Sequence, residues 1–268
     1  MSPDAFVLAR KDWDSDFFGR EIFGLEVNDE FDPAELGSAI EDLDQHELWG
    51  TECHLPTAQF GVTPVLEELG FRLVDSRMVF VSTWTVDDIA DVDVPHGRLR
   101  PVRDGDLTEI DALTVRHLVD NPMFRSRFTD RRLFTREESI RYYAAWNRLA
   151  LRQDPDLFVV WDVDGAVVGY FNYMRQGEAD GLPMFKGVLT AIDSDHRGHD
   201  AQNIMQSYLF ARFGVERWAL DNTTQITNLG VVRNHIKAGK RFQDAIITLY
   251  RLSGDAPSWG MIDGQLDN

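Results

Sequence analysis

Cysteine is almost absent from this chain of 268 residues, in which Cys53 is the only one. A single cysteine excludes a disulfide within the chain and is typical of proteins in a reducing compartment, so we expect a cytoplasmic protein. No Cys–His signature surrounds Cys53. We therefore expect its side chain to be a buried small hydrophobe rather than a nucleophile.

Long apolar runs are also missing. No stretch approaches the roughly 20 apolar residues that a membrane-spanning helix needs. The opening residues, MSPDAFVLARKDWD, contain no apolar segment of the kind found in signal peptides. We therefore expect neither a membrane anchor nor a secretion signal.

Positive charge is scarce: 27 Lys and Arg face 45 Asp and Glu, which gives a formal net charge of −18. Such a field repels nucleic acids and anionic membranes, so we expect neither as a partner. A phosphorylated small molecule would need local basic or N–H groups to bind. No ligand spacing supports a metal site, even where Asp193, Asp195, His196 and His199 gather.

The composition that is present, 43% hydrophobic and 27% charged, is that of a folded protein. The length suffices for one large domain or two modest ones. Residues 89–97, IADVDVPHG, are acidic and end in Pro and Gly, which is typical of a linker. We therefore predict one domain at 1–91, a second at 97–253 and a flexible tail at 254–268.

Hydrophobic periodicity and turn signals predict an alternation of helices and strands along the whole chain. In order, they predict a packed segment over Phe6–Leu25, helices over Pro33–Leu48 and Thr57–Leu69, a strand over Phe71–Trp84, a strand over Arg98–Arg103, a helix capped by Asp106, a helix from the Thr135/Glu138 capping box to Gln153, hairpin strands Leu157–Val163 and Ala166–Met174, and a polar loop Gln176–Pro183.

The stretch from Phe185 to Arg251 predicts strand, loop, helix, strand, helix and strand. Its loop, Asp193 to Gly198, leads into a helix that starts near His199, where unpaired N–H groups and the helix dipole suit a phosphate. A second helix begins near Asn228 and carries His235. The pattern indicates either a nucleotide-type donor site beside an acid/base residue or an ordinary α/β layer with a capped helix.

An internal similarity links the two halves of the chain. LGFRLVDSRMVFV (69–81) aligns without a gap with AGKRFQDAIITLY (238–250), so that Gly70 matches Gly239 and Asp75 matches Asp244. Both segments read as the end of a helix, a glycine and a strand. The two halves therefore share a topology, unless a common helix-to-strand unit matches by chance.

The sequence resembles the GNAT superfamily of N-acyltransferases. The resemblance rests on HRGHDAQNIM (196–205) at the donor-binding motif, NLGVVRNHIKAGKRF (228–242) at the last motif, and the order of elements from Arg98 to Leu252. Within the superfamily the chain is most similar to bacterial TDP-fucosamine acetyltransferases and related nucleotide-aminosugar N-acyltransferases. That likeness includes WDSDFFG (13–19), LEELGFRLVD (66–75) and TQITN (224–228).

This resemblance implies an α/β (α+β) GNAT fold. In such a fold a mixed central sheet is flanked by helices, here preceded by a smaller, truncated GNAT-like α/β domain. It also implies transfer of an acyl group from a coenzyme A thioester to the amine of a nucleotide-linked deoxyaminosugar or a similar small amine. Association with a second copy of the chain is left open.

The resemblance also assigns residues by position. Backbone N–H groups of Thr190, Ala191 and Ile192 are expected to hold the thioester carbonyl, and the loop and helix start of Arg197, Gly198, His199, Asp200, Ala201 and Gln202 the pyrophosphate. His235 stands where relatives carry a tyrosine that protonates the leaving thiolate, and as an imidazolium it would be a competent acid. Asn228 either holds the donor or caps its helix. Arg125, Arg127 and Phe128 lie in the loop that faces the acceptor in relatives, where arginine suits a diphosphate.

Two departures from the family pattern leave alternative functions open. Asp200 and Gln202 replace glycines of the donor loop, and a carboxylate close to a phosphate is unfavourable. Asp200 could instead cap the helix. His235 replaces the tyrosine. The alternatives are therefore a non-catalytic protein that binds a nucleotide sugar or a protein partner, and acyl transfer from a carrier other than coenzyme A.

Overall fold

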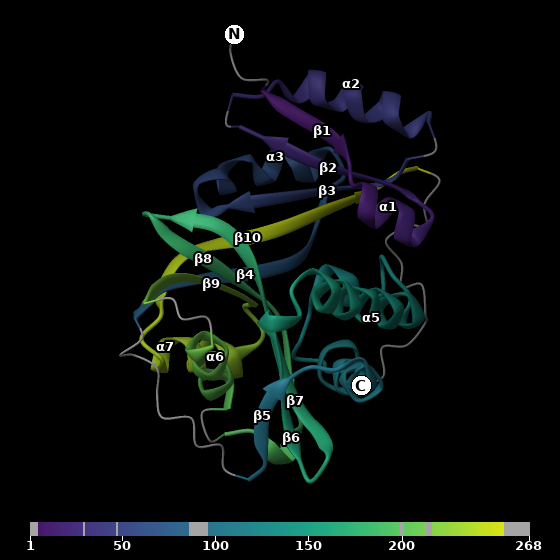
Figure 1. Cartoon of the computed structure of the whole chain (residues 1–268). Helices are drawn as coiled ribbons and strands as arrows, with labels where there is room; N and C mark the ends of the chain where they lie inside the picture. The colour runs from purple at the N-terminus through teal and green to yellow at the C-terminus, as the bar shows by residue number, and fades with distance from the viewer. Residues whose placement is uncertain are drawn as a thin grey trace. The chain divides into compact units, whose positions relative to one another are not determined.

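The computed structural model describes residues 5–28, 30–46, 48–85, 96–198, 201–212 and 216–254 (Figure 1). Most of the predicted linker and almost all of the predicted tail lie outside these ranges. No helix of the described part is long and apolar enough to cross a membrane.

The chain divides into two compact units. The first comprises Met1–Arg77, Ser126–Glu138 and Asp244–Asn268, and the second comprises Met78–Arg125 and Ser139–Gln243. These boundaries differ from the predicted one at 91–97. The physical reason is that strands β4 (Arg72–Thr85) and β10 (Arg241–Leu252) each begin in one unit and end in the other.

The first unit contains a four-stranded mixed sheet in the order β1-β2-β3-β10. Strand β1 (Phe6–Arg10) pairs antiparallel with β2 (Glu21–Val27), which runs parallel to β3 (Leu48–Pro56). Strand β10 pairs antiparallel with β3 from Ile246 to Leu252. The helices of this unit are α1 (Asp12–Phe18), α2 (Pro33–Asp44) and α3 (Thr63–Glu68), with 3-10 turns at Thr57–Val62 and Arg127–Thr129.

One face of this sheet forms a hydrophobic core with α2 and α3. Leu36 and Ile40 of α2 and Leu66 of α3 pack against alternate residues of the strands, among them Leu25 and Cys53. Cys53 is fully buried, and burial raises the pKa of its thiol to about 12. Its expected role as a small hydrophobic residue is confirmed.

The second unit contains the sheet order β9-β8-β7-β6-β5. Its strands are β5 (Arg98–Pro101), β6 (Phe158–Val163), β7 (Ala166–Ala179), β8 (Leu182–Ile192) and β9 (Arg217–Gln225). The helices are α4 (Leu107–Thr114), which continues into a π-helical turn at Val115–Val119, α5 (Arg136–Gln153, whose first three residues belong to the first unit), α6 (Ala201–Ala211) and α7 (Leu229–Lys237). Short 3-10 turns lie at Asp104–Asp106, Pro155–Leu157 and Ser194–His196.

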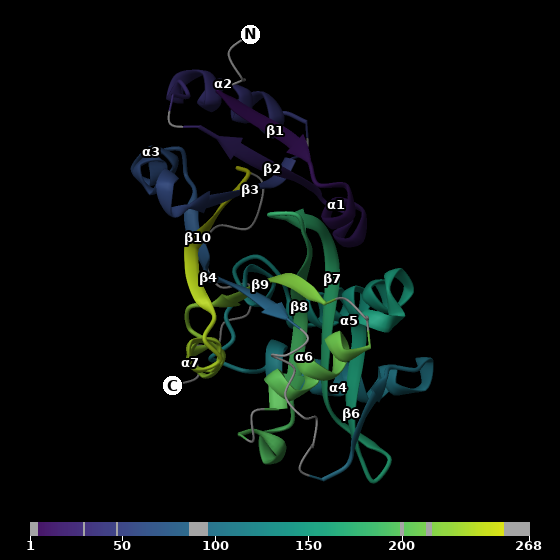
Figure 2. The same cartoon turned by 60° about the vertical axis from the view of Figure 1, so that its left-hand side comes forward.

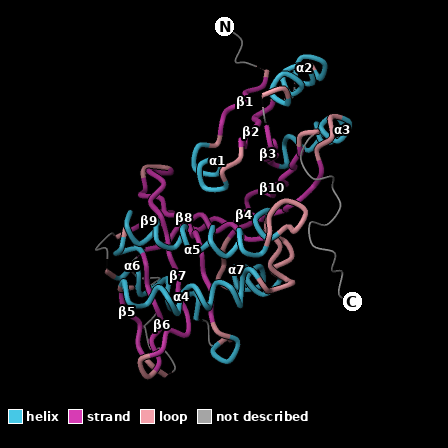
Figure 3. The backbone as a smooth tube through the Cα atoms, turned by 90° about the vertical axis from the view of Figure 1, so that its right-hand side faces the viewer, coloured by secondary structure: helices cyan, strands magenta, loops and turns pink. Residues whose placement is uncertain are grey.

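Alternating residues of β7 place helices on both faces of this sheet. The Tyr170 hydroxyl lies 2.8 Å from Thr114 of α4, whereas Phe171 and Tyr173 pack with α6 in the main core. Helices α4 and α5 run side by side across the strands (Figure 3), and α6 lies along β8 and β7 (Figure 2). The sheet is therefore a buried layer between helices.

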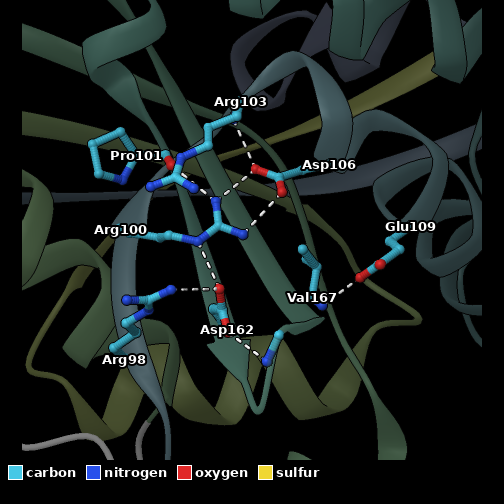
Figure 4. Close-up of polar contacts among 9 residues, drawn as sticks. Arg98, Arg100, Pro101, Arg103, Asp106, Glu109, Asp162 and Val167 are labelled. Carbon is cyan, nitrogen blue, oxygen red and sulfur yellow. Dashed lines mark hydrogen bonds and ion pairs between the residues drawn. The ribbon is translucent and has the colours of Figure 1, made fainter.

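The Thr135/Glu138 capping box is confirmed at the start of α5, where each residue's backbone N–H donates to the other's side chain. Asp106 has a different role from the predicted cap. Its carboxylate accepts from the Arg103 N–H and from the Arg100 guanidinium (2.7 and 2.9 Å), while the Arg100 Nε donates to Asp162 of β6 at 2.7 Å (Figure 4). Arg100 therefore links β5 to β6 and to the 3-10 turn that precedes α4.

The predicted polar loop Gln176–Pro183 is wrong. Strands β7 and β8 extend through it as a hairpin, with Glu178 opposite Pro183 and a two-residue turn at Asp180-Gly181. Both turn residues have positive φ (52° and 72°), as the Asp164-Gly165 turn of the preceding hairpin also does. The polar side chains of this segment do not prevent pairing because exposed strand ends tolerate them.

Candidate functional site

The divergence of β8 from β9 is the main irregularity of the second unit's sheet. The two parallel strands pair at Met184↔Ala219, Phe185↔Leu220 and Lys186↔Asp221 only, although β8 continues to Ile192 and β9 to Gln225. Beyond Lys186 the peptide groups on that side of β8 have no β9 partner. Buried N–H groups without a partner must find another acceptor, so such an edge suits a bound carbonyl.

Gly187 and Asn222 are the first residues beyond the last pair. A Cβ added to Gly187 would lie 2.6 Å from the Asn222 amide nitrogen. Glycine is therefore what allows the Asn222 side chain to lie at the start of the β8–β9 divergence.

The three residues expected to hold the thioester carbonyl lie on β8 past this point. Thr190 and Ala191 pair with Phe171 and Tyr170 of β7, and the Thr190 hydroxyl donates to the Tyr170 carbonyl at 3.0 Å. Thr190, Ala191 and Ile192 therefore lie where β8 has left β9. Their contact with a donor stays a prediction.

The expected pyrophosphate loop follows β8 directly. Gly198 has φ +98°, a left-handed conformation that favours glycine, and α6 begins at Ala201. Arg197 donates to the Ile192 carbonyl at 3.0 Å and contacts the His117 ring at 2.6 Å. His199 and Asp200 lie outside the described residues. Gln202 is buried in α6 and accepts from Asn234 of α7 at 2.8 Å.

Arg116 and His117 join this loop without having been predicted. Arg116 forms an ion pair with Asp193, and His117 lies 4.0 Å from the same carboxylate. Burial, followed by Arg197, lowers the pKa of His117. These two residues lie on the π-helical turn after α4, and no feature of sequence spacing distinguishes such a turn from ordinary helix.

A closed group of four buried polar side chains lies beside the β8–β9 divergence. Lys240 Nζ donates to Asn222 Oδ1 (2.6 Å) and to Gln206 Oε1 (3.0 Å). The Tyr173 hydroxyl donates to Gln206 Oε1 (2.8 Å) and accepts from Asn222 Nδ2 (3.3 Å). Lys240 is 5% exposed, and burial lowers its pKa to about 7. Sequence analysis missed this group because its members come from β7, α6, β9 and the residue before β10.

His235 is brought close to this group, but in a different protonation state from the one expected. It is 2% exposed, and its ring lies 5.2 Å from that of Phe80. Burial, together with Lys240, lowers its pKa to about 3. Burial therefore favours the neutral ring near pH 7, which argues against an imidazolium acid, and a role of His235 in catalysis stays a prediction. Its Nδ1 has no hydrogen-bond partner among the described residues.

Asn228 occupies the N-cap position of α7. Its side chain makes no capping hydrogen bond within the helix. The simple capping role left open by the sequence is therefore not the one seen, and its role toward a donor stays a prediction.

The three residues expected to bind the acceptor are divided between the two units. Arg127 lies 2.7 Å from Glu52 and over the ring of Phe128, which is 3% exposed and packs with Phe18 and Phe134, all within the first unit. Arg125 belongs to the second unit and is exposed. Arg127 and Phe128 therefore have a packing role, which an arginine- and aromatic-rich loop does not reveal in sequence.

No group of three or more His, Cys, Asp or Glu side chains able to hold a metal ion occurs in the described part of the chain.

Comparison with solved structures identifies the fold. The chain is similar to a GCN5-related N-acetyltransferase from Sphaerobacter thermophilus, with a TM-score of 0.56, 15% identity, and coverage of 94% of this chain and 77% of that one. It is also similar to a tandem GNAT protein from the clavulanic acid biosynthesis pathway, with a TM-score of 0.58, 14% identity, and coverage of 89% of this chain and 77% of that one. For a GCN5-related N-acetyltransferase from Kribbella flavida the TM-score is 0.53 and the identity 16%, with coverage of 86% of this chain and 81% of that one.

The chain has a GNAT fold. The tandem GNAT neighbour fits the division into two units. No protein-family model matches the sequence, and no curated protein matches it. At these identities the likeness describes the GNAT fold and not the reaction.

Proposed function

We propose that this protein is an N-acyltransferase that moves an acyl group from a coenzyme A thioester to an amine. The observation that carries the proposal is the divergence of β8 from β9 beyond Lys186, which leaves the Gly187–Ile192 edge open for a thioester carbonyl. In this position backbone N–H groups can donate to the carbonyl and to the oxyanion that it becomes.

The reaction needs a neutral amine that attacks the carbonyl carbon, after which the C–S bond breaks and the sulfur takes a proton. Thr190 to Ile192 would hold the carbonyl oxygen, and the Arg197–Gln202 segment would face the diphosphate of the donor. Arg197 adds positive charge at that loop in an otherwise acidic protein, whereas the charge of Arg116 is offset by its ion pair with Asp193. Asn228 is proposed to contact the donor at the start of α7.

The acceptor we propose is the amine of a nucleotide-linked deoxyaminosugar. The support for it is the sequence resemblance in 13–19, 66–75 and 224–228. Of the residues predicted to bind it, Arg127 pairs with Glu52 and Phe128 is buried, whereas the side chain of Arg125 is exposed.

Calorimetric titration with acetyl-CoA tests donor binding. We expect the wild-type chain to bind, and Gly187→Ala to weaken binding at least about tenfold, which is about 1.4 kcal/mol. The added methyl group would clash with the Asn222 amide at the start of the divergence, so the local structure must shift there. Gly105→Ala is the matched control, because a Cβ there meets nothing within 4 Å. Equal affinity in wild type and Gly187→Ala would place the donor elsewhere.

The acceptor is tested separately, by release of free thiol from acetyl-CoA in the presence of a dTDP-linked aminosugar. Absence of acetyl-CoA binding, with stabilisation by the dTDP sugar alone, would favour the second candidate: a non-catalytic protein that binds a nucleotide sugar. The replacement of donor-loop glycines by Asp200 and Gln202 favours that candidate. Turnover with an acylated carrier protein but not with acetyl-CoA would indicate a different donor.

A further inference from the structure

Lys240 is a buried cation whose partners are all neutral. Its ammonium group donates to two side-chain amide oxygens, those of Asn222 and Gln206. No carboxylate forms an ion pair with it within the part of the chain that is described. An ammonium has three donors, so one N–H remains beyond these two acceptors.

The polar groups around Lys240 come from several elements. Gln206 of α6 and Asn222 of β9 contact it, Tyr173 of β7 bonds to both of these side chains, and His235 of α7 is near enough for Lys240 to lower its pKa. None of these four groups is acidic. The nearest carboxylate along β9, Asp221, points to the opposite face of the strand, where it lies 3.9 Å from Lys186. The cation is therefore uncompensated, which is unfavourable for folding and lowers the pKa of the amine to about 7.

A purely structural role does not need such a group. An apolar residue of similar length would fill the same space without the free energy of burying a charge, and a neutral amide would satisfy Gln206 and Asn222. Buried titratable groups with strongly shifted pKa values concentrate at functional sites.

The position of Lys240 relates it to the β8–β9 divergence. Its Nζ lies 2.6 Å from the Asn222 amide oxygen, and the amide nitrogen of the same side chain lies 2.6 Å from the Cβ position of Gly187. One amide group thus separates the ammonium from the first unpaired residue of β8. His235 stands at the position of the acid in relatives, but its ring is neutral near pH 7 and is therefore a poor proton donor.

We propose that Lys240 is the proton donor to the departing thiolate. This inference rests on the acyl transfer proposed above. The acceptor amine forms the new C–N bond, the C–S bond breaks with its electron pair on sulfur, and one N–H proton of the Lys240 ammonium passes to that sulfur. The proton that the attacking nitrogen loses goes to solvent, and the Lys240 amine regains one from solvent before the next cycle.

The test measures the thiol pKa of free coenzyme A bound to the protein, followed by ultraviolet thiolate absorbance, so that no acceptor is needed. Calorimetry first establishes that coenzyme A binds. We then expect the bound thiol pKa to lie at least about 1 unit below that of free coenzyme A, because the proposed contact with the Lys240 ammonium favours the thiolate over the thiol. In Lys240→Met the shift should disappear while binding remains. Lys237→Met, at the exposed end of α7, is the matched control and should keep the shift.

The outcomes separate the two proposals. If coenzyme A does not bind to the wild type, the proposed function fails. If it binds but the wild-type thiol pKa is unshifted, Lys240 is not the proton donor, and this result needs no variant to fold. An equal shift in wild type and Lys240→Met also overturns the inference.

Discussion

At the scale of single residues, the burial of Lys240 makes the free energy of unfolding depend on pH. Its folded pKa of about 7 lies below the usual value of 10.5, so between these values the unfolded chain binds more protons than the folded one. Stability therefore rises with pH across this window, by at most about 1.4 kcal/mol per pH unit. The free energy cost of the buried charge is fully present below pH 7 and fades as pH rises toward 10.5.

We accordingly predict that Lys240→Met is as stable as the wild type or more stable at pH 7, and that this advantage shrinks by pH 9.5. The measurement is urea unfolding at both pH values. Lys237→Met should show no such pH dependence, since its side chain is exposed. A Lys240→Met variant that is equally destabilised at both pH values would mean that the ammonium is compensated in the folded state.

Single residues also show where sequence reasoning ends. Cys53 was predicted correctly because it lies in no catalytic Cys–His signature, and a cysteine without one is usually a buried small hydrophobe. His235 was singled out from the sequence, but its protonation state depends on burial and on Lys240, which only the tertiary structure brings close to it. The Arg127 partner, Glu52, is 75 positions away in the sequence, and no local signal links them.

At the scale of elements, Glu52 of β3 holds three segments of the first unit together. Its carboxylate, 2% exposed, lies 2.7 Å from Arg127 and 2.9 Å from His54, and it also pairs with Lys11 at the start of α1. Burial raises the pKa of Glu52, but Arg127, His54 and Lys11 outweigh this effect and hold it well below its usual range.

We predict that Glu52→Gln destabilises the first unit by roughly 3–5 kcal/mol, because removing one member of a buried ionic group leaves cations without a counter-ion. Since the folded pKa is depressed, the stabilisation in the wild type is present above the unfolded pKa and is lost as pH falls through the folded value. Hydrogen exchange of β3 amides, compared with those of β7, measures the effect locally. Glu26→Gln, on exposed β2 surface, is the control; equal exchange in both variants would contradict the prediction.

Elements were predictable where local chemistry decides them. The Thr135/Glu138 box and the Asp164-Gly165 turn both formed where the sequence placed them. The helix predicted over Thr57–Leu69 is instead a 3-10 turn followed by α3, with Pro64 in the first turn of α3. At the β8–β9 divergence Asn222 meets Gly187 across two strands, and no local pattern encodes that contact.

At the scale of the whole molecule, the internal similarity found in the sequence has a structural counterpart. Gly70 ends α3 with φ +92° before β4, and Gly239 follows α7 with φ +72° before β10. Only the existence of two units could be read from the sequence. Their boundaries could not, because β4 and β10 cross from one unit to the other while remaining continuous hydrophobic strands.

The net charge of −18 is a property of the whole chain, and it predicts how the folded state responds to salt. Like charges on a compact molecule repel one another, whereas the ion pairs of Glu52 and Arg100 are buried and weakly screened.

Raising NaCl from about 0.01 M to about 1 M shortens the screening length from about 30 Å to about 3 Å. We therefore expect the melting temperature to rise by about 2–4 °C, which corresponds to roughly 1 kcal/mol for a chain of this size. The same scan near pH 4.7, the isoelectric point of the sequence, is the control, since the net charge is then close to zero and the salt effect should vanish. A melting temperature that falls with salt at neutral pH would mean that exposed ion pairs, rather than net repulsion, dominate the electrostatics of this fold.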